Sequence, residues 1–278
     1  MASLRQATAT LAAAGVASPL FDAQTLAAYV LGCSRMDLIL HDTENLPEKF
    51  ADLVARRAQR VPLQHLLGTA PFGHLELAVG PGVFVPRPET ELLGEWAVQW
   101  VRARGVDKPR VVDLCTGSGA LALYLATLLP DAEVTAVELD PRAAAWTQRN
   151  IATLAPQVRL ELGDVTSPTV LTELSGSCDL VVSNPPYVPE STQVDPEVRV
   201  DPHHAVFSGD SGMDVIEAML PVLARLLKVG GALGIEHDDS TAAQVRAVLE
   251  QAGCFGNIVS HRDFAGRDRY VSAEKICE

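Results

Sequence analysis

Short apolar runs alternate with helical segments from Arg110 onward, and few folds can accommodate such an alternation. Short runs rich in valine and leucine are typical of strands buried on both faces, and intervening helices let consecutive strands run parallel. The expected strands are residues 111–114, 134–137, 158–160, 180–183 and 232–235. The expected helices are residues 120–129, 141–154, 212–227 and 241–251. The sequence therefore predicts an α/β fold with a Rossmann-like, doubly wound, mostly parallel sheet.

Residues 1–68 lack this alternation and have the pattern of helices instead. Ser18 and Pro19 fit the N-cap and first turn of one helix, and Gly32 fits its end. Apolar side chains on one face of that helix are Leu26, Ala27 and Val30. We therefore expect a small N-terminal helical domain over residues 1–68.

Residues 69–88 are punctuated by glycine and proline, which mark turns and loops. Within this stretch Leu75, Leu77 and Val79 alternate with other residues, as in a short hairpin strand. We interpret residues 69–88 as a linker hairpin. Residues 89–278 then form the larger domain.

The formal net charge is -13, from 22 basic and 35 acidic residues. Residues 1–80 hold 6 of the basic and 7 of the acidic side chains, so the acidity lies mainly in the larger domain. Binding to long nucleic acids requires clustered Lys and Arg that neutralise phosphates. The charge therefore disfavours direct binding of long nucleic acids and suits a basic protein partner.

The longest apolar run, around residues 120–126, is far shorter than the roughly 20 residues that cross a bilayer. The first five residues do not resemble the start of a signal peptide. We therefore expect a cytoplasmic protein that does not bind membranes, and we expect a monomer.

Cysteine and histidine patterns do not suggest a metal site. The five cysteines are scattered, without a C-x-x-C pair, which disfavours zinc and a disulfide framework; we interpret most of them as small buried apolar residues. His203, His204 and His237 could be proposed as ligands, but partners at ligand spacing are missing. We interpret these histidines as loop or core residues and expect no metal.

A glycine-containing turn follows the first predicted strand of the larger domain. Asp113 lies in that strand, and the turn itself reads Cys115, Thr116, Gly117, Ser118 and Gly119. Glycines at a strand-to-helix turn let the backbone pass close to a ligand. Such a turn also occurs in dinucleotide-binding enzymes, but the third glycine of their G-x-G-x-x-G pattern is replaced here by Ala122.

Acidic residues follow the next two predicted strands. Glu138 lies 25 residues after Asp113, where a carboxylate can accept hydrogen bonds from both ribose hydroxyls of an adenosine ligand. The alternative is a helix cap, but Asp140 before Pro141 already fits that role. Asp164, followed by Val165, could accept a hydrogen bond from an adenine amino group, or could simply be a turn residue.

Ser183-Asn184-Pro185-Pro186-Tyr187 follows the fourth predicted strand. Two consecutive prolines lack N–H groups and have restricted backbone angles, so the adjacent carbonyls point rigidly outward. The Asn184 side-chain oxygen and the Pro185 backbone oxygen can accept the two hydrogens of an –NH2 group, while the Tyr187 ring stacks on its plane.

An amide nitrogen is a poor nucleophile because its lone pair is delocalised into the carbonyl group. Accepting both of its N–H hydrogens returns electron density to the nitrogen, and a rigid turn aims that nitrogen at an electrophilic carbon. Asn184, Pro185 and Tyr187 are therefore the candidate catalytic residues for methyl transfer to a planar nitrogen. A polyproline turn without chemistry is the alternative.

On these residues the chain resembles the glutamine-N5 methyltransferases of peptide-chain release factors, the HemK/PrmC family. The Asn184–Tyr187 motif is shared with DNA methyltransferases that act on amino groups, whereas other segments are typical of the family. These segments are residues 60–62 leading to Gly68, Phe72-Gly73, residues 85–91, residues 208–212 and residues 265–269. The most diagnostic of them is Pro86-Arg87-Pro88-Glu89-Thr90-Glu91.

This resemblance implies a seven-stranded methyltransferase sheet and S-adenosylmethionine as methyl donor, with S-adenosylhomocysteine as product and no metal. The implied donor-binding residues are Asp113, Cys115, Thr116, Gly117, Ser118, Gly119, Glu138, Asp164, Val165 and Asn184. The implied substrate-binding residues are Arg87, Asn184, Pro185, Pro186 and Tyr187. The implied partner is a class 1 release factor, methylated on the glutamine of its Gly-Gly-Gln motif and held in part by the helical domain.

Three features depart from the family pattern. Cys115 replaces a common glycine, which costs on the order of 1 kcal/mol if that backbone has a positive φ. His65 replaces a usual tyrosine, and residues 201–206 differ in their middle.

Arg87 and Glu89 could also act only as ion-pairing braces at a domain junction. Two alternatives to release factor methylation stay open. The chain could methylate another substrate, such as DNA adenine, a ribosomal protein glutamine or a small amide, or it could be a binding module without turnover.

Overall fold

The computed structural model describes residues 3–278, which form two compact units. A helical unit comprises the chain up to Ala70, together with Val79–Pro81 and Val194–Val200. A sheet unit comprises Pro71–Ala78, Gly82–Gln193 and Asp201–Glu278. The chain therefore leaves the sheet unit after Gln193, contributes seven residues to the helical unit, and returns at Asp201.

The helical unit buries an apolar core between short helices. Leu11, Leu26, Leu46 and Phe50 are fully buried within it. Its elements are α1 (Leu4–Ala13), α2 (Pro19–Leu31), η1 (Met36–Leu40), α3 (Glu48–Ala58), α4 (Leu63–Leu67) and η3 (Val198–Val200). The helical interpretation of this region is thus confirmed.

The predicted bounds of α2 are confirmed, but its predicted N-cap is not. Pro19 begins the helix and Gly32 ends it with a left-handed φ of 67°, both as predicted. Ser18 occupies the N-cap position, but its side chain accepts no capping hydrogen bond, so that part of the prediction is wrong. Its ψ of 63° lies outside the extended region usual for a capping residue.

Buried ion pairs attach Val194–Val200 to the helical unit. Arg57 is only 4% exposed, and it pairs with Asp22 and with Glu197, each at 2.7 Å. Arg60, from one of the family segments, pairs with Asp195 at 2.8 Å and also with Glu197. Breaking a buried pair leaves a charge uncompensated, so these contacts hold the acidic segment firmly.

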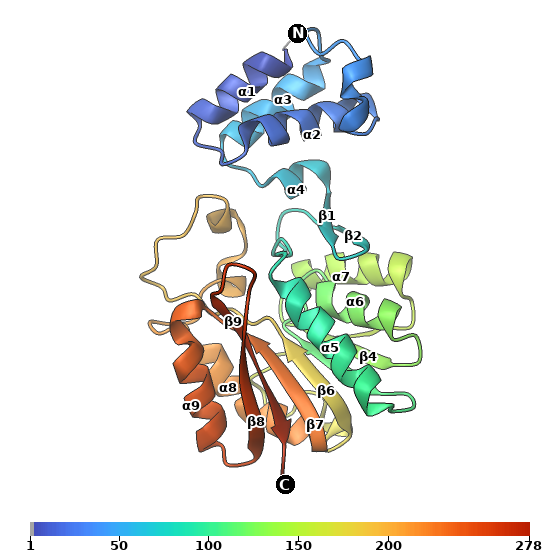
Figure 1. The fold of residues 1–278 in the computed structure, drawn as a ribbon, viewed down its shortest axis with the longest axis vertical. Coiled ribbons are helices and arrows are strands. Elements are labelled where there is room, and N and C mark those ends of the chain that lie inside the picture. The colour runs from blue at the N-terminus through green and yellow to red at the C-terminus, as the bar shows by residue number, and fades with distance from the viewer. Residues whose placement is uncertain (1–2) are drawn as a thin grey trace. The chain divides into compact units, whose positions relative to one another are not determined.

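The sheet unit is built around a seven-stranded sheet with the strand order β5-β4-β3-β6-β7-β9-β8 (Figure 1). The strands are β3 (Arg110–Leu114), β4 (Glu133–Glu138), β5 (Arg159–Leu162), β6 (Cys178–Ser183), β7 (Leu227–Glu236), β8 (Phe255–Arg262) and β9 (Asp268–Lys275). The first five in this order pair in parallel, and β9 is antiparallel to β7 and β8. This confirms the predicted mostly parallel, seven-stranded α/β sheet.

Helices cover both faces of this sheet (Figure 1). On one face lie α5 (Thr90–Arg104), α6 (Ala120–Leu128) and α7 (Pro141–Leu154), and on the other lie α8 (Asp214–Leu226) and α9 (Ala242–Gln251). Val112, Leu114, Leu233 and Ile235 turn toward α8 and α9 in one fully buried cluster. Shorter elements are β1 (Thr69–Phe72) and β2 (Leu75–Ala78), the predicted hairpin, with η2 (Thr172–Leu174), η4 (His203–Ala205) and η5 (Asp239–Thr241).

The burial of the cysteines and histidines agrees only in part with what the sequence predicted. All five cysteines are free, but only Cys178 is fully buried and Cys277 is exposed, so the interpretation of most of them as buried core residues is wrong. His237 is fully buried, whereas His203 and His204 lie near the surface beside Glu190 and Asp140.

Across residues 3–278, His, Cys, Asp and Glu side chains do not gather in threes that could hold a metal ion. Within the same residues, every helix is too short or too polar to cross a bilayer.

Candidate active site

The candidate site lies where the parallel strands end. Strand order reverses between β3 and β6, and ligands of open α/β sheets bind in the crevice beyond the carboxyl ends at such a point. The Ser183 hydroxyl donates a hydrogen bond of 2.8 Å to the carbonyl of Leu114, its neighbour at the end of β3. The glycine turn after β3 and the Asn184–Tyr187 loop after β6 therefore begin side by side.

Buried polar groups of α7 hold the glycine turn in place. Thr147 donates a hydrogen bond of 2.6 Å to the Gly117 carbonyl, and Asn150 donates one of 2.9 Å to the Ser118 carbonyl. Asn150 also binds the backbone of Ala78 in β2 through its amide oxygen and its amide nitrogen. Thr147 and Asn150 were not predicted from the sequence, although two polar residues three positions apart on the buried face of an amphipathic helix are an available signal.

The two glycines of the turn serve different purposes. Both have positive φ, 60° at Gly117 and 86° at Gly119. A Cβ atom at Gly119 would lie 3.0 Å from Thr147 and 3.1 Å from Leu123, so this glycine permits close helix packing. A Cβ atom at Gly117 would meet no atom within 4 Å. The backbone at Gly117 therefore borders open space that a ligand can enter.

Cys115 has a φ of 61°, the strained conformation that its replacement of a family glycine foretold. Its side chain packs against the apolar cluster between the sheet and α8. Burial raises the pKa of its thiol, and the carboxylate of Glu138 raises it further. The thiol is therefore protonated and unsuited to nucleophilic chemistry.

The Asp113 carboxylate lies beneath the turn rather than on its open side. It accepts hydrogen bonds from the Thr116 hydroxyl and from the Ala122 backbone N–H, and it is 1% exposed. Burial raises the pKa of Asp113 to about 7, although both hydrogen bonds act in the opposite direction. Asp113 thus braces the turn from inside.

Glu138 ends β4 beside the glycine turn. Its carboxylate accepts three backbone hydrogen bonds, from Gly117 at 2.8 Å, Leu139 at 3.0 Å and Asp140 at 2.9 Å. Burial nevertheless raises the pKa of Glu138. Asp140 caps α7 as predicted, by accepting a hydrogen bond from the Arg142 N–H. A carboxylate offers about four lone-pair positions, so Glu138 keeps capacity for a further donor.

Two exposed leucines beside the acidic residues were missed. Leu139 follows Glu138 in the chain, and Leu162 of β5 lies opposite Glu138 of β4 in the sheet. Both leucines are 56% exposed. Nearby Asp164 is exposed and accepts hydrogen bonds from the Thr166 N–H and hydroxyl, while the Val165 side chain is buried in the core. Val165 can therefore meet a ligand only through its backbone. Large apolar side chains left in solvent next to a carboxylate fit a flat, partly apolar ligand.

Hydrogen bonds orient the side chains of the Asn184–Tyr187 loop. The Asn184 amide nitrogen donates to the Thr90 hydroxyl at 3.1 Å, which leaves the Asn184 oxygen for another donor. The Tyr187 hydroxyl donates to Glu236 at 2.9 Å, and burial strongly raises the pKa of that tyrosine. Pro185 and Pro186 between them are buried and rigid.

A second loop, residues 206–212, supports this motif from behind. Backbone hydrogen bonds join Val188 to Val206 and to Ser208 on either side of a parallel bridge. Gly212 has a φ of 77°, and a Cβ atom there would lie 2.3 Å from the Tyr187 carbonyl oxygen. Close approach to the motif's backbone therefore requires glycine at position 212, which explains part of the family segment at residues 208–212.

Arg87 lies outside this hydrogen-bonded cluster. Its guanidinium pairs with Asp201 at 2.9 Å and stacks over Phe84 at 4.9 Å. Burial raises the pKa of Asp201 to about 6, although Arg87 lowers it. Glu89 lies 4.0 Å from Arg267. Arg87 and Glu89 therefore both form ion pairs within the sheet unit, rather than between the two units as the bracing alternative supposed.

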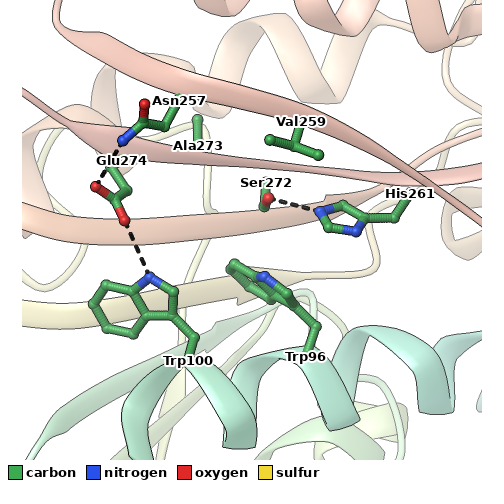
Figure 2. Close-up of a pocket in the computed structure, with 8 residues that line it drawn as sticks. All are labelled: Trp96, Trp100, Asn257, Val259, His261, Ser272, Ala273 and Glu274. Carbon is green, nitrogen blue, oxygen red and sulfur yellow. Dashed lines mark hydrogen bonds between the residues drawn. The ribbon is translucent and has the colours of Figure 1, made fainter. Parts of the chain in front are cut away.

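A separate groove of about 200 Å³ lies away from the strand ends (Figure 2). Trp96 and Trp100 of α5 face Ser272, Ala273 and Glu274 of β9 across it. These β9 residues pair with the middle of β7, several positions before Glu236. The groove is therefore distinct from the candidate site.

Two family models match the chain. One, described as the PrmC N-terminal domain, matches residues 2–68, and the other, described as the methyltransferase small domain, matches residues 98–200. A release factor glutamine methyltransferase of Corynebacterium glutamicum is 60% identical over 274 residues, which cover 99% of this chain and 98% of the relative. That of Mycolicibacterium smegmatis is 50% identical, with 99% and 97% covered.

Solved structures resemble the chain in fold. The hMettl16 catalytic domain, in complex with MAT2A 3'UTR hairpin 6, matches with a TM-score of 0.58 and 15% identity, covering 91% of this chain and 93% of that one. A ribosomal protein L11 methylase from Lactobacillus delbrueckii subsp. bulgaricus matches with a TM-score of 0.50 and 19% identity, covering 72% and 84%. At these identities the likeness concerns the fold alone.

Proposed function

The chain belongs to the release factor glutamine methyltransferase family, and we propose that it methylates the side-chain amide of the glutamine in the Gly-Gly-Gln motif of class 1 release factors. The proposed donor is S-adenosylmethionine, which becomes S-adenosylhomocysteine. The observation that carries this proposal is the Asn184 side chain, whose nitrogen is held by Thr90 so that its oxygen remains available at the carboxyl end of β6. The adjacent strand β3 leads into the glycine turn with its open space at Gly117.

The residues around the glycine turn fit the proposed donor. Open space at Gly117 accommodates a ligand against the backbone, and Glu138 has a remaining lone pair for a ribose hydroxyl. Leu139 and Leu162 provide apolar surfaces for an adenine ring, and Asp164 lies beyond β5 for its amino group. When bound, S-adenosylmethionine supplies a methyl group that its positive sulfur makes electrophilic.

The proposed mechanism depends on positioning. The Asn184 oxygen and the Pro185 carbonyl accept the two N–H hydrogens of the glutamine amide, and the Tyr187 ring packs on its plane. Electron density thereby returns to the nitrogen, whose lone pair is aimed at the methyl carbon. Fixed dipoles of this kind lower the barrier without a strong base, and the extra proton leaves the nitrogen after transfer.

The helical unit is the proposed holder of the release factor. Several of its large apolar side chains are exposed to solvent rather than packed in its core: Leu20, Phe21, Tyr29, Met36, Ile39 and Leu40. Exposed apolar patches commonly mark protein-binding surfaces. The net charge of -13, which lies mainly in the larger domain, favours a basic protein partner over nucleic acid.

Incubation with isotope-labelled S-adenosylmethionine and a class 1 release factor should label one glutamine of that factor. The same factor with this glutamine changed to alanine should remain unlabelled, because the transferred methyl group then has no acceptor nitrogen. Mass spectrometry of proteolytic peptides locates the label. Labelling that persists in the alanine variant, or that goes to DNA instead, contradicts the proposal.

Replacing Gly117 with alanine should weaken binding of S-adenosylhomocysteine by about tenfold, which corresponds to about 1.4 kcal/mol. The added methyl group enters the open space that the donor is proposed to occupy. Gly105→Ala is a matched control, because Gly105 also has a φ of 60° and no neighbour within 4 Å, but it ends α5. Both variants should lose roughly 1 kcal/mol of stability from backbone strain. Equal affinities in the two variants, measured by calorimetry, place the donor elsewhere.

A further inference from the structure

We propose that Thr90 and Glu236 are positioning residues that fix the orientation of the Asn184 amide, so that its oxygen and not its NH2 group faces the substrate. This inference rests on the proposed function for its meaning, but it concerns hydrogen bonds within the chain itself. It assigns a role to Thr90, the first residue of α5, and to Glu236, the last residue of β7.

An asparagine side chain has an oxygen on one side and an NH2 group on the other, and only the oxygen can accept a hydrogen bond. Rotation by half a turn would present two donors to the substrate amide, which also offers donors there. The Asn184 nitrogen is held by the Thr90 hydroxyl at 3.1 Å. Thr90 is 3% exposed, so water does not readily replace it.

A hydroxyl group that accepts a hydrogen bond still has one hydrogen to donate. We infer that Glu236 accepts it, because the Thr90 hydroxyl lowers the pKa of this carboxyl and the buried Glu236 Oε2 has no other partner within residues 3–278. The Glu236 Oε1 accepts from Tyr187. An ionised carboxylate can only accept hydrogen bonds, so Glu236 sets the donor-to-acceptor direction of the whole series of hydrogen bonds. Thr90 must donate to Glu236, Asn184 must donate to Thr90, and the Asn184 oxygen remains for the substrate.

The same carboxylate positions the second side chain of the motif. Glu236 accepts a hydrogen bond of 2.9 Å from the Tyr187 hydroxyl, and it is 1% exposed. Thr90 and Tyr187 approach it from different segments, α5 and the loop after β6. One buried acceptor therefore aligns both the amide oxygen and the aromatic ring that the proposed mechanism uses.

Protonation of Glu236 should disturb this order. Burial raises the pKa of Glu236 to about 7, Glu89 raises it further, and Arg269 of β9 acts in the opposite direction together with Tyr187 and Thr90. Below that pH a protonated Glu236 becomes a donor and competes to donate to Thr90 and Tyr187. The Thr90 hydroxyl can then donate to Asn184, which favours the rotated amide. The turnover rate should therefore rise as pH increases through about 7.

The variants Thr90→Val and Thr90→Ser separate this role from packing, because valine matches the shape of threonine without its hydroxyl and serine keeps the hydroxyl. We expect Thr90→Val to lower kcat at least about tenfold, with KM for the release factor and the melting temperature little changed. Thr90→Ser should restore most of the rate and the pH dependence. Glu236→Gln should turn over slowly, at a rate that does not change from about pH 6 to about pH 8.

A second measurement needs no release factor, so its result is independent of the proposed function. In the full chain, the side-chain NH2 resonances of Asn184 should shift with a midpoint near pH 7. This titration should survive in Thr90→Ser and disappear in Glu236→Gln and in Thr90→Val. Resonances that ignore pH and all three substitutions overturn the inference, as does a Thr90→Val enzyme with the wild-type rate and pH profile. Wild-type protein that shows the titration but does not label a release factor refutes the function and leaves the inference standing.

Discussion

Asn184→Ala lowers methyl transfer to the release factor by about 10²-fold or more, with little loss of stability. Removing one preorganised polar group from an active site typically costs this much, equivalent to about 2.7 kcal/mol of transition-state stabilisation. The alanine variant leaves one N–H of the glutamine amide without its acceptor, so less electron density returns to the nitrogen. Single-turnover rates with saturating donor and factor measure the effect on the chemical step.

Asn257→Ala is the matched control for this experiment. Asn257 also donates a side-chain amide hydrogen bond, 3.1 Å to Glu274, but it lies in the groove of Figure 2, away from the strand ends. The control should turn over at the wild-type rate and lose some stability, because alanine tolerates its left-handed φ of 50° less well than asparagine does. Asn184→Ala should melt near the wild-type temperature. An Asn184→Ala enzyme with normal turnover removes Asn184 from the mechanism and favours a different acceptor site.

Gly212→Ala should also reduce turnover by about 10²-fold, although residue 212 bears no side chain that could take part in the chemistry. The new methyl group would lie 2.3 Å from the Tyr187 carbonyl oxygen, so the motif loop must move. A displacement of about 1 Å in a positioned group can cost about 10²-fold in rate. Backbone strain at a φ of 77° adds roughly 1–2 kcal/mol of destabilisation.

Gly230→Ala is a control that separates the effect of a displaced loop on turnover from the effect of backbone strain alone. Gly230 has a φ of 84°, and a Cβ atom there would meet no atom within 4 Å. This control should lose comparable stability from strain and keep its activity. Turnover and thermal unfolding of both variants provide the comparison. If Gly212→Ala and Gly230→Ala behave alike, the loop at residues 206–212 does not position the motif.

The sequence located the parallel strands well because their pattern is simple. Strands buried on both faces are continuous apolar runs, and the predicted strand at residues 111–114 differs from β3 by one residue. The largest error is β7, which begins at Leu227 rather than at residue 232. Gly230 and Gly231 interrupt its apolar pattern, so only the part after them was recognised.

The candidate site was predicted as a set of residue types but not as a network. Glu138 was expected to bind a ribose, and the structure shows that it also accepts three backbone hydrogen bonds. One comes from Gly117 in the turn after β3, and the others come from Leu139 and Asp140 directly after β4. The Asn184–Thr90 contact joins residues 94 positions apart, and Tyr187–Glu236 joins residues 49 apart. Such pairs depend on strand order and register, which short sequence motifs do not encode.

The acidic segment Val194–Val200 also imposes an order on biosynthesis. Arg60 and Glu197 are 137 residues apart, so a ribosome that adds roughly 5–20 residues per second synthesises the first several seconds before the second. Through that interval Arg57 has Asp22 but still lacks Glu197. The nascent helices therefore acquire their last charged partner only after most of the parallel strands have left the ribosome, which couples maturation of the amino-terminal region to synthesis of the remainder.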